Sequence, residues 1–178
     1  MSFLFLIATS SFLAWGTSLL VKNPLDLRGA MRWGMGLGFL FTGCDHFINA
    51  SNRYVPMIPD ILASHALEWV YITGIAELAG GAGLLVSPRV YSRLGLPNLQ
   101  RHAGIWLAVM LACVVTANIN VAVKGHAVQG LDFGTWYFWL RPFFQPVFIA
   151  WALYCVGVWP QPWPRIGNQP RTPRKATI

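Results

Sequence analysis

The stretch GLGFLFTGCDHFINASNRY, residues 36–54, joins a long apolar run to an adjacent acid and base, Asp45 and His46. Ionisable side chains in apolar surroundings cost free energy unless they find polar partners. The stretch therefore predicts a helix that carries part of a polar site. The partners must come from other segments of the chain.

The composition is that of a very apolar chain. Of its 178 residues, 55% are hydrophobic and 11% are charged, and the net charge is +7. The hydrophobic fraction exceeds, and the charged fraction falls below, the averages of soluble domains. Basic charge on so apolar a chain favours contact with a membrane surface over nucleic-acid binding. We therefore expect a lipid bilayer, and no nucleic acid, among its partners.

Five apolar stretches of about 20 residues follow one another, and such lengths suffice for helices to cross a hydrocarbon core of ~30 Å. The predicted fold class is an all-α membrane protein. It has an N-terminal transmembrane helix within residues 1–22, a four-helix transmembrane core over residues 30–159, and a basic, proline-rich cytoplasmic tail over residues 160–178. The stretches are 2–21, 30–50, 66–86, 102–123 and 137–159.

The lysines and arginines are distributed unevenly between successive loops, with more of them in the first loop, the third loop and the tail. Positively charged loops stay on the cytoplasmic side of a membrane. This distribution predicts a multi-pass protein with its N-terminus outside and its C-terminus in the cytoplasm.

Helical spacing directs several polar side chains toward the bundle interior. His46 follows Thr42 by four residues, and Gln145 follows Arg141 by four, so each pair shares one helix face. Glu77 lies on a face with two glycines. Opposite Arg141 or His46 its carboxylate could stay ionised, whereas alone it would be protonated. Ionisable groups within a membrane mark functional sites, although bridging between helices is the structural alternative.

Among the polar residues of these helices we assign no catalytic residue. We also assign no metal ligand, since the acids and histidines lack a ligand spacing such as H-x-x-x-H. Asp45 lies about 100° around its helix from His46, near the edge of the proposed pocket. The predicted ligand-binding residues are Asp45, His46, Glu77, Asn118, Arg141 and Gln145.

Several motifs together resemble the DoxX-like family of small bacterial membrane proteins, over about residues 30–157. This resemblance implies a four-helix transmembrane bundle in the bacterial inner membrane, preceded here by one extra helix. It also selects Asn118 over Asn120, while Thr116 stands where the family commonly has proline. The motifs are GCDHF (43–47), YVPMIPDIL (54–62), YITGIAELAGGAGLL (71–85), TANINVAV (116–123) and WLRPFFQPV (139–147).

Two functions remain open. In the first, the pocket binds a quinone or a lipid-like molecule near the outer leaflet, in a redox-linked membrane system. Some DoxX-like relatives are subunits of quinone-linked oxidoreductases, so the resemblance implies such a subunit role. The chain shows no intrinsic cofactor, and a separate redox protein would supply the electrons. In the second, the chain is a non-enzymatic subunit or assembly chaperone whose glycine-rich helix faces pack against a partner membrane protein.

Overall fold

The computed structural model describes residues 2–125, 128 and 134–160. Over these residues the chain is helical, without a strand, and each predicted apolar stretch forms an α-helix. One π-helical turn, η1, and two 3-10 segments, η2 and η3, separate α2 from α3. In chain order the elements are α1 (Ser2–Ser18), α2 (Leu27–Ile48), η1 (Ala50–Tyr54), η2 (Val55–Met57), η3 (Asp60–His65), α3 (Ala66–Leu85), α4 (Pro88–Arg93), α5 (Gln100–Lys124) and α6 (Thr135–Cys155).

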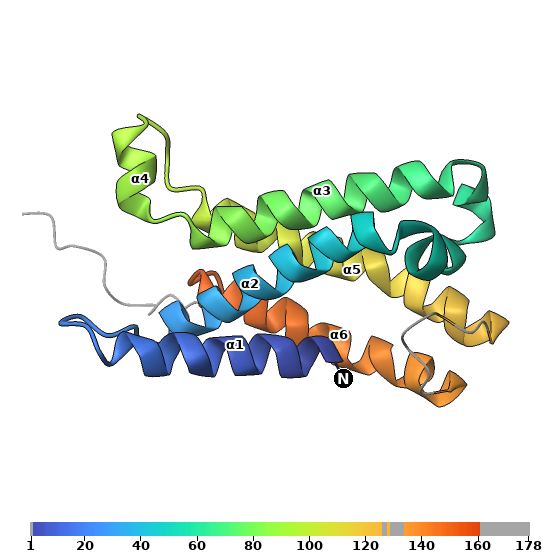
Figure 1. The fold of residues 1–178 in the computed structure, drawn as a ribbon, viewed down its shortest axis with the longest axis horizontal. Helices are drawn as coiled ribbons and strands as arrows, with labels where there is room; N and C mark the ends of the chain where they lie inside the picture. Colours follow the sequence, from blue (N-terminus) through green and yellow to red (C-terminus); the bar gives the residue numbers. More distant parts are fainter. Residues whose placement is uncertain (1, 126–127, 129–133, 161–178) are drawn as a thin grey trace, which may run out of the picture.

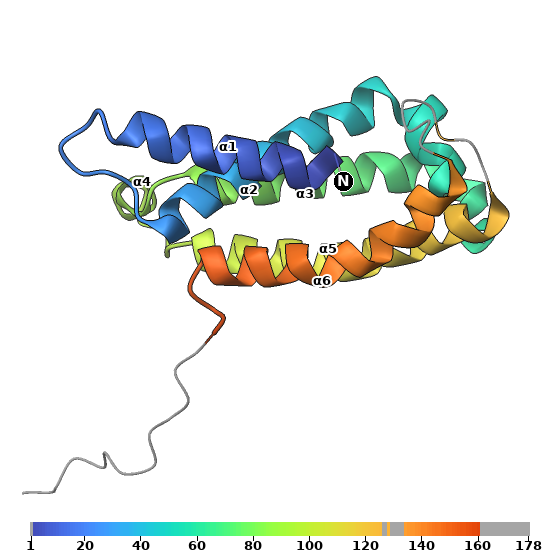
Figure 2. The same ribbon diagram turned by 90° about the horizontal axis from the view of Figure 1, so that it is seen from below.

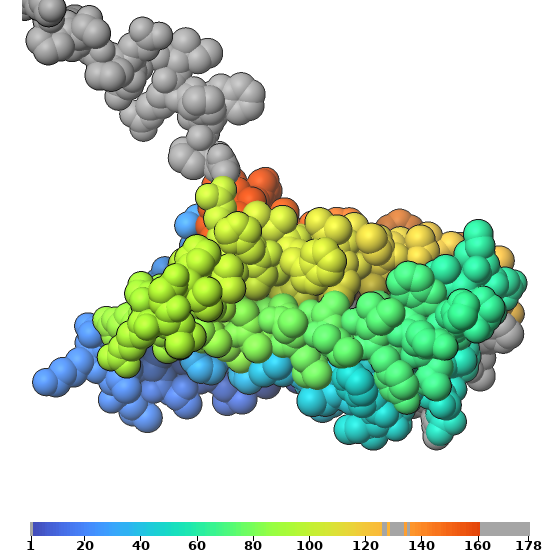
Figure 3. Space-filling view, turned by 90° about the horizontal axis from the view of Figure 1, so that it is seen from above, coloured from blue at the N-terminus to red at the C-terminus, as the bar shows by residue number. Residues whose placement is uncertain are grey.

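The long helices run roughly along one axis (Figure 1) and form two layers. Figure 2 shows α1, α2 and α3 in one layer and α5 with α6 in the other. On the face drawn in Figure 3, α3 lies between α2 and α5, and the short α4 covers one end. The cavity described below lies toward the opposite end, where α2 passes into η1.

A core of buried apolar side chains fills the space between the layers. Met35 and Phe39 of α2 lie in one cluster with Leu107 of α5 and Ala152 of α6. Ile7 of α1 belongs to the same cluster and is fully buried. The N-terminal helix therefore packs as part of the same bundle as the later helices.

Glycines let α2 approach its neighbours closely. A Cβ atom added to Gly81 of α3 would lie 2.8 Å from the carbonyl oxygen of Gly36. One added to Gly34 would lie 2.4 Å from the carbonyl oxygen of Ile7 in α1. Only glycine permits such backbone approach. The glycine-rich faces that the sequence offers to a partner protein are thus used within the bundle.

Residues 50–58, here called the covering segment, fold back over the end of α2. The segment comprises η1, η2 and Ile58, and it is tied to α5 by Asn120. The Asn120 side-chain amide donates to the carbonyl oxygens of Met57 (3.3 Å) and Ile58 (3.2 Å). Met57 is buried beside Val121. The segment is therefore an ordered wall of the bundle, between the second and third of the predicted helices.

The prediction of five membrane-spanning helices is wrong. Among the described helices, α5 alone is long and apolar enough to cross a membrane, judged by length and composition. A core helix of a soluble protein passes the same test. In α5, 39% of the 18-residue stretch that is apolar enough is buried inside the bundle. The multi-pass topology, the outside N-terminus and the inner-membrane localisation lose their basis with this prediction.

The prediction of five spans failed because of the kinds of residue that made the stretches look apolar. α1 has only 17 residues, and α2 carries Arg28, Arg32 and Asp45. The apolar residues of α6 are interrupted by Trp, Tyr, Arg, Gln and Pro. Trp and Tyr count as hydrophobic by area, but their polar N–H and O–H groups need partners. The predicted cytoplasmic tail lies, from residue 161, outside the described residues.

Candidate functional site

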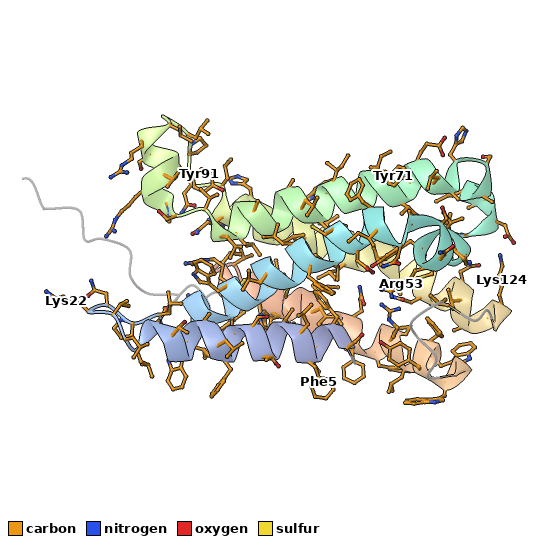
Figure 4. The ribbon with its side chains drawn as sticks, in the orientation of Figure 1. Phe5, Lys22, Arg53, Tyr71, Tyr91 and Lys124 are labelled. Carbon is orange, nitrogen blue, oxygen red and sulfur yellow. The ribbon has the colours of Figure 1, made fainter. Side chains whose placement is uncertain are left out.

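A cavity of about 330 Å³ lies within the bundle, and its size falls in the range of small-molecule sites. Its walls come from α1, α2, the covering segment, α3, α5 and α6. Figure 4 shows one lining residue, Arg53, in the half of the bundle that ends at Lys124, away from Lys22. All six residues that the sequence singled out line this one cavity: Asp45, His46, Glu77, Asn118, Arg141 and Gln145.

His46 is held in one orientation by its own helix and by the covering segment. Its Nδ1 donates to the Thr42 carbonyl oxygen at 2.9 Å, so in the neutral ring Nε2 carries the lone pair. The ring stacks on Tyr54, with centroids 3.8 Å apart. Burial lowers the pKa of His46 by more than the Thr42 bond and the Asp45 charge raise it. His46 is therefore neutral near pH 7.

Asp45 lines the cavity and anchors the covering segment. Its carboxylate accepts hydrogen bonds from Arg53, from the Tyr54 hydroxyl (2.8 Å) and from Asn49. Burial alone would raise the pKa of Asp45, but these hydrogen bonds and the Arg53 charge together hold it below its ordinary value. Asp45 is thus an ionised and fully engaged group, whose charge Arg53 balances.

Glu77 projects from α3 and is buried, with 7% of its surface exposed. Its Oε2 lies 3.6 Å from His46 Nδ1, but that nitrogen already donates to Thr42. Burial raises the pKa of Glu77 to about 7, against the lowering effect of a Thr42 hydrogen bond. Oε2 is buried and has no hydrogen-bond partner. Glu77 is therefore a carboxyl group that is protonated over part of the physiological pH range.

Asn118 and Arg141 each present a buried, unpaired atom. Asn118 Oδ1 and Arg141 Nη1 have no hydrogen-bond partner. The Arg141 guanidinium lies 5.6 Å from the ring centroid of Tyr137 and 5.9 Å from that of Phe138. Burial lowers the pKa of Arg141, yet a guanidinium stays protonated at physiological pH. The cavity therefore holds a positive charge supported by aromatic faces.

Gln145 follows Arg141 by one helical turn and faces α5. Its amide nitrogen donates to the Leu111 carbonyl oxygen at 2.6 Å, which ties α6 to α5. Asn120, over which the resemblance selected Asn118, and Glu68 are not among the residues that line the cavity. Asn120 holds the covering segment, and Glu68 is largely exposed beside His65.

Sequence reasoning missed two parts of the cavity wall. The first is the pair Arg53 and Tyr54 on the covering segment. Arg53 follows Asp45 by eight residues, so continuing the helical phase past Ile48 would have found it. The second is the start of α1, where Phe3 and Leu6 line the cavity. No signal in the sequence separates these two from the other apolar residues of α1.

No three His, Cys, Asp or Glu side chains gather in a metal-binding arrangement within the part of the chain that the structure describes. Asp45, His46 and Glu77 share the cavity, but the Asp45 carboxylate is occupied by Arg53, Tyr54 and Asn49. The described walls can bind a ligand through hydrogen bonds, through charge and through apolar contacts.

Comparison with known proteins gives one family. Residues 35–156 match the family model described as a domain of unknown function (DUF8561). The predicted membership in the DoxX-like family is therefore wrong. All five short motifs that suggested it lie within the residues that match DUF8561. Neither the curated proteins nor the solved structures contain a significant match to this chain.

Proposed function

Because the chain belongs to the family of the domain of unknown function DUF8561, whose description names no activity, we propose its function from the cavity. We propose that the cavity binds an amphiphilic small molecule, quinone-like or lipid-like. The polar head of this molecule lies against Glu77, Asn118 and Arg141, and its apolar part lies against the aromatic and aliphatic wall.

The observation that carries this proposal is the grouping of three unpaired atoms. Glu77 Oε2, Asn118 Oδ1 and Arg141 Nη1 are the buried side-chain polar atoms without a hydrogen-bond partner among the described residues, and all three residues line one cavity. Leaving such a group unpaired costs about 1–3 kcal/mol, and most buried polar groups are paired. A bound head group supplies the missing partners. Ordered water is the alternative.

The apolar residues of the lining support an amphiphile over a small polar solute. Phe3 and Leu6 of α1, Phe39 of α2 and Phe148 of α6 line the cavity together with Val114 of α5. Water gains nothing from such a wall, whereas burial of an apolar chain against it contributes about 25 cal/mol per Å². The cavity thus combines a polar end with an apolar wall, as sites for amphiphiles do.

A cavity-filling substitution tests the proposal. Full-length protein is incubated with a cell lipid extract, repurified and examined by native mass spectrometry. Ala117 lines the cavity on α5, so Ala117→Phe should remove a retained small molecule. Ala112, exposed on the same helix and outside the lining, provides the control Ala112→Phe, which should keep it. Wild-type protein that retains no organic molecule would leave water as the occupant and overturn the proposal.

A second candidate is a non-enzymatic subunit that packs against another protein. Apolar side chains stand exposed along α1, among them Phe5 (68% exposed) and Phe12 (67%). Figure 4 shows Phe5 directed away from the bundle. Large exposed apolar patches are usually covered by a partner. In this case Phe5→Ser with Phe12→Ser should release a co-purifying protein, while Ala117→Phe should not.

A further inference from the structure

Arg141 carries a positive charge that is not paired with any carboxylate in the part of the chain that the structure describes. Among the described residues, no carboxylate lies within ion-pairing distance of its guanidinium, and Nη1 is buried without a hydrogen bond. A buried charge usually has a counter-charge, because desolvation is costly. The charged and titratable groups lining the cavity are Asp45 and His46 of α2, Arg53 and Tyr54 of η1, Glu77 of α3, and Tyr137 and Arg141 of α6.

The other groups around the cavity do not balance this charge. Asp45 is paired with Arg53 and also accepts from the Tyr54 hydroxyl. The base nearest to Glu77 is His46, and its Nδ1 proton is directed to a backbone carbonyl. Burial, which raises the pKa of Glu77 to about 7, keeps this carboxyl protonated below that pH. The lining then carries one net positive charge.

Aromatic faces position the Arg141 guanidinium without using its hydrogen bonds. The rings of Tyr137 and Phe138 lie within 6 Å of it, which is the range of cation–π attraction. A guanidinium is a planar fork that binds a carboxylate through two parallel N–H bonds. A head group facing Arg141 can therefore be flat, singly charged and held by two oxygens.

We propose, on the premise that the cavity binds an amphiphile, that its ligand is a single-chain molecule with a carboxylate head group. This head group supplies the counter-ion that the described walls of the cavity do not provide for Arg141. A protonated Glu77 donates to the same carboxylate, and Asn118 presents its NH₂ group to it when the side-chain amide rotates. The apolar chain of the ligand lies along Phe39, Val114 and the start of α1. A cavity of about 330 Å³ suits one chain better than the paired chains of a phospholipid.

Three probes with ten-carbon chains test this inference by equilibrium dialysis against the full-length protein at pH 6. The probes are decanoate, decanol and a benzoquinone with a decyl tail. Decanoate should bind about 10- to 100-fold more tightly than decanol, the range expected for a hydrogen bond to a charged group. Arg141→Gln should remove this preference, because it should weaken the binding of decanoate much more than the binding of decanol. Arg141→Lys should keep part of it, because charge remains without the fork.

The matched control is Arg93→Gln, which removes one positive charge from exposed α4 at the other end of the bundle, and decanoate should still be preferred. Equal binding of decanoate and decanol to wild-type protein would overturn the carboxylate inference. Tighter binding of the quinone than of decanoate would also overturn it. Either result would leave the proposed amphiphile site intact. Failure of all three probes to bind would overturn both. If Arg141→Gln does not fold, the comparison of decanoate with decanol on wild-type protein still decides.

Discussion

The ring of His46 in α2 lies face to face with the ring of Tyr54 in η1, with centroids 3.8 Å apart and planes inclined by 25°. The Tyr54 hydroxyl reaches past this stack to Asp45, the residue next to His46. One side chain of the covering segment thus orients both members of the acid–base pair that made residues 36–54 unusual.

Removing the Tyr54 hydroxyl should loosen the covering segment. Tyr54→Phe keeps the stack on His46 but loses the hydrogen bond to the Asp45 carboxylate, and bonds to charged groups contribute ~1.5–3 kcal/mol. Chemical unfolding should show a loss of this size. Tyr71→Phe is the control, because Tyr71 also stacks on a neighbour, Phe47, and is more exposed. Equal losses in the two variants would contradict a specific role for the Tyr54 hydroxyl.

Glu77 should make stability depend on pH. Its folded pKa of about 7 lies above its ordinary value of 4.5, so its contribution to stability is complete below pH 4.5. That contribution is lost as the pH rises through 7. The carboxyl ionises easily in the unfolded chain, whereas inside the bundle its ionisation costs free energy. The difference in unfolding free energy between wild type and Glu77→Gln should therefore shift by ~3 kcal/mol against the wild type between pH 4.5 and pH 8.

His46 contributes with the opposite sign, because its folded pKa is lowered and its stabilisation is lost as the pH falls below 6.5. Both proteins keep His46, so subtracting one unfolding curve from the other isolates Glu77. A difference that stays constant over this pH range would show that Glu77 is not held protonated.

The contact between α2 and α3 should not tolerate a methyl group at Gly74. A Cβ at this position would lie 2.8 Å from the Cβ of His46 and 3.1 Å from the Phe47 ring. Gly74→Ala should cost ~1–3 kcal/mol by overpacking and should also weaken probe binding by displacing His46. Gly16→Ala in α1, where nothing lies within 4 Å, should instead stabilise by about 0.5–1 kcal/mol. Thermal unfolding of both variants checks the difference in sign.

Asn120 should govern the opening of the covering segment. Asn120→Ala removes the hydrogen bonds to Met57 and Ile58, so the amides of η2 should exchange hydrogen faster, by about 5- to 10-fold for ~1 kcal/mol. Asn52→Ala, at an exposed position of η1, provides the control and should leave their exchange unchanged. Slow exchange in both variants would mean that other contacts hold the segment.

The helices and the inward polar faces could be predicted because each leaves a local pattern. Arg141 and Gln145 are four residues apart, and both line the cavity. The surroundings of the bundle could not be predicted in this way. Side chains such as Phe39 and Leu107 are buried in one cluster, and an apolar residue that packs inside the bundle looks the same in sequence as one that faces lipid.

The π-helical geometry of η1 could not be predicted from sequence either, although the spacing from Asp45 would have located Arg53. This turn carries Arg53 and Tyr54 over the end of α2, where both side chains bind the Asp45 carboxylate, and the η2 segment that follows it is tied to α5 by Asn120. Pro56 lies within the 3-10 segment η2, and Pro59 directly precedes the 3-10 segment η3.

The walls of the cavity are not held in the same way. α2 packs closely against α1 and α3 at glycines, where the backbones approach each other, and this leaves the helices no space to slide past one another. The covering segment is instead held by side-chain hydrogen bonds at Asp45 and Asn120, which can break one at a time, together with the stack of Tyr54 on His46 and the burial of Met57. The residence time of a bound molecule should therefore be set at this segment. Changes there should alter how fast the molecule enters and leaves more than how tightly it is bound.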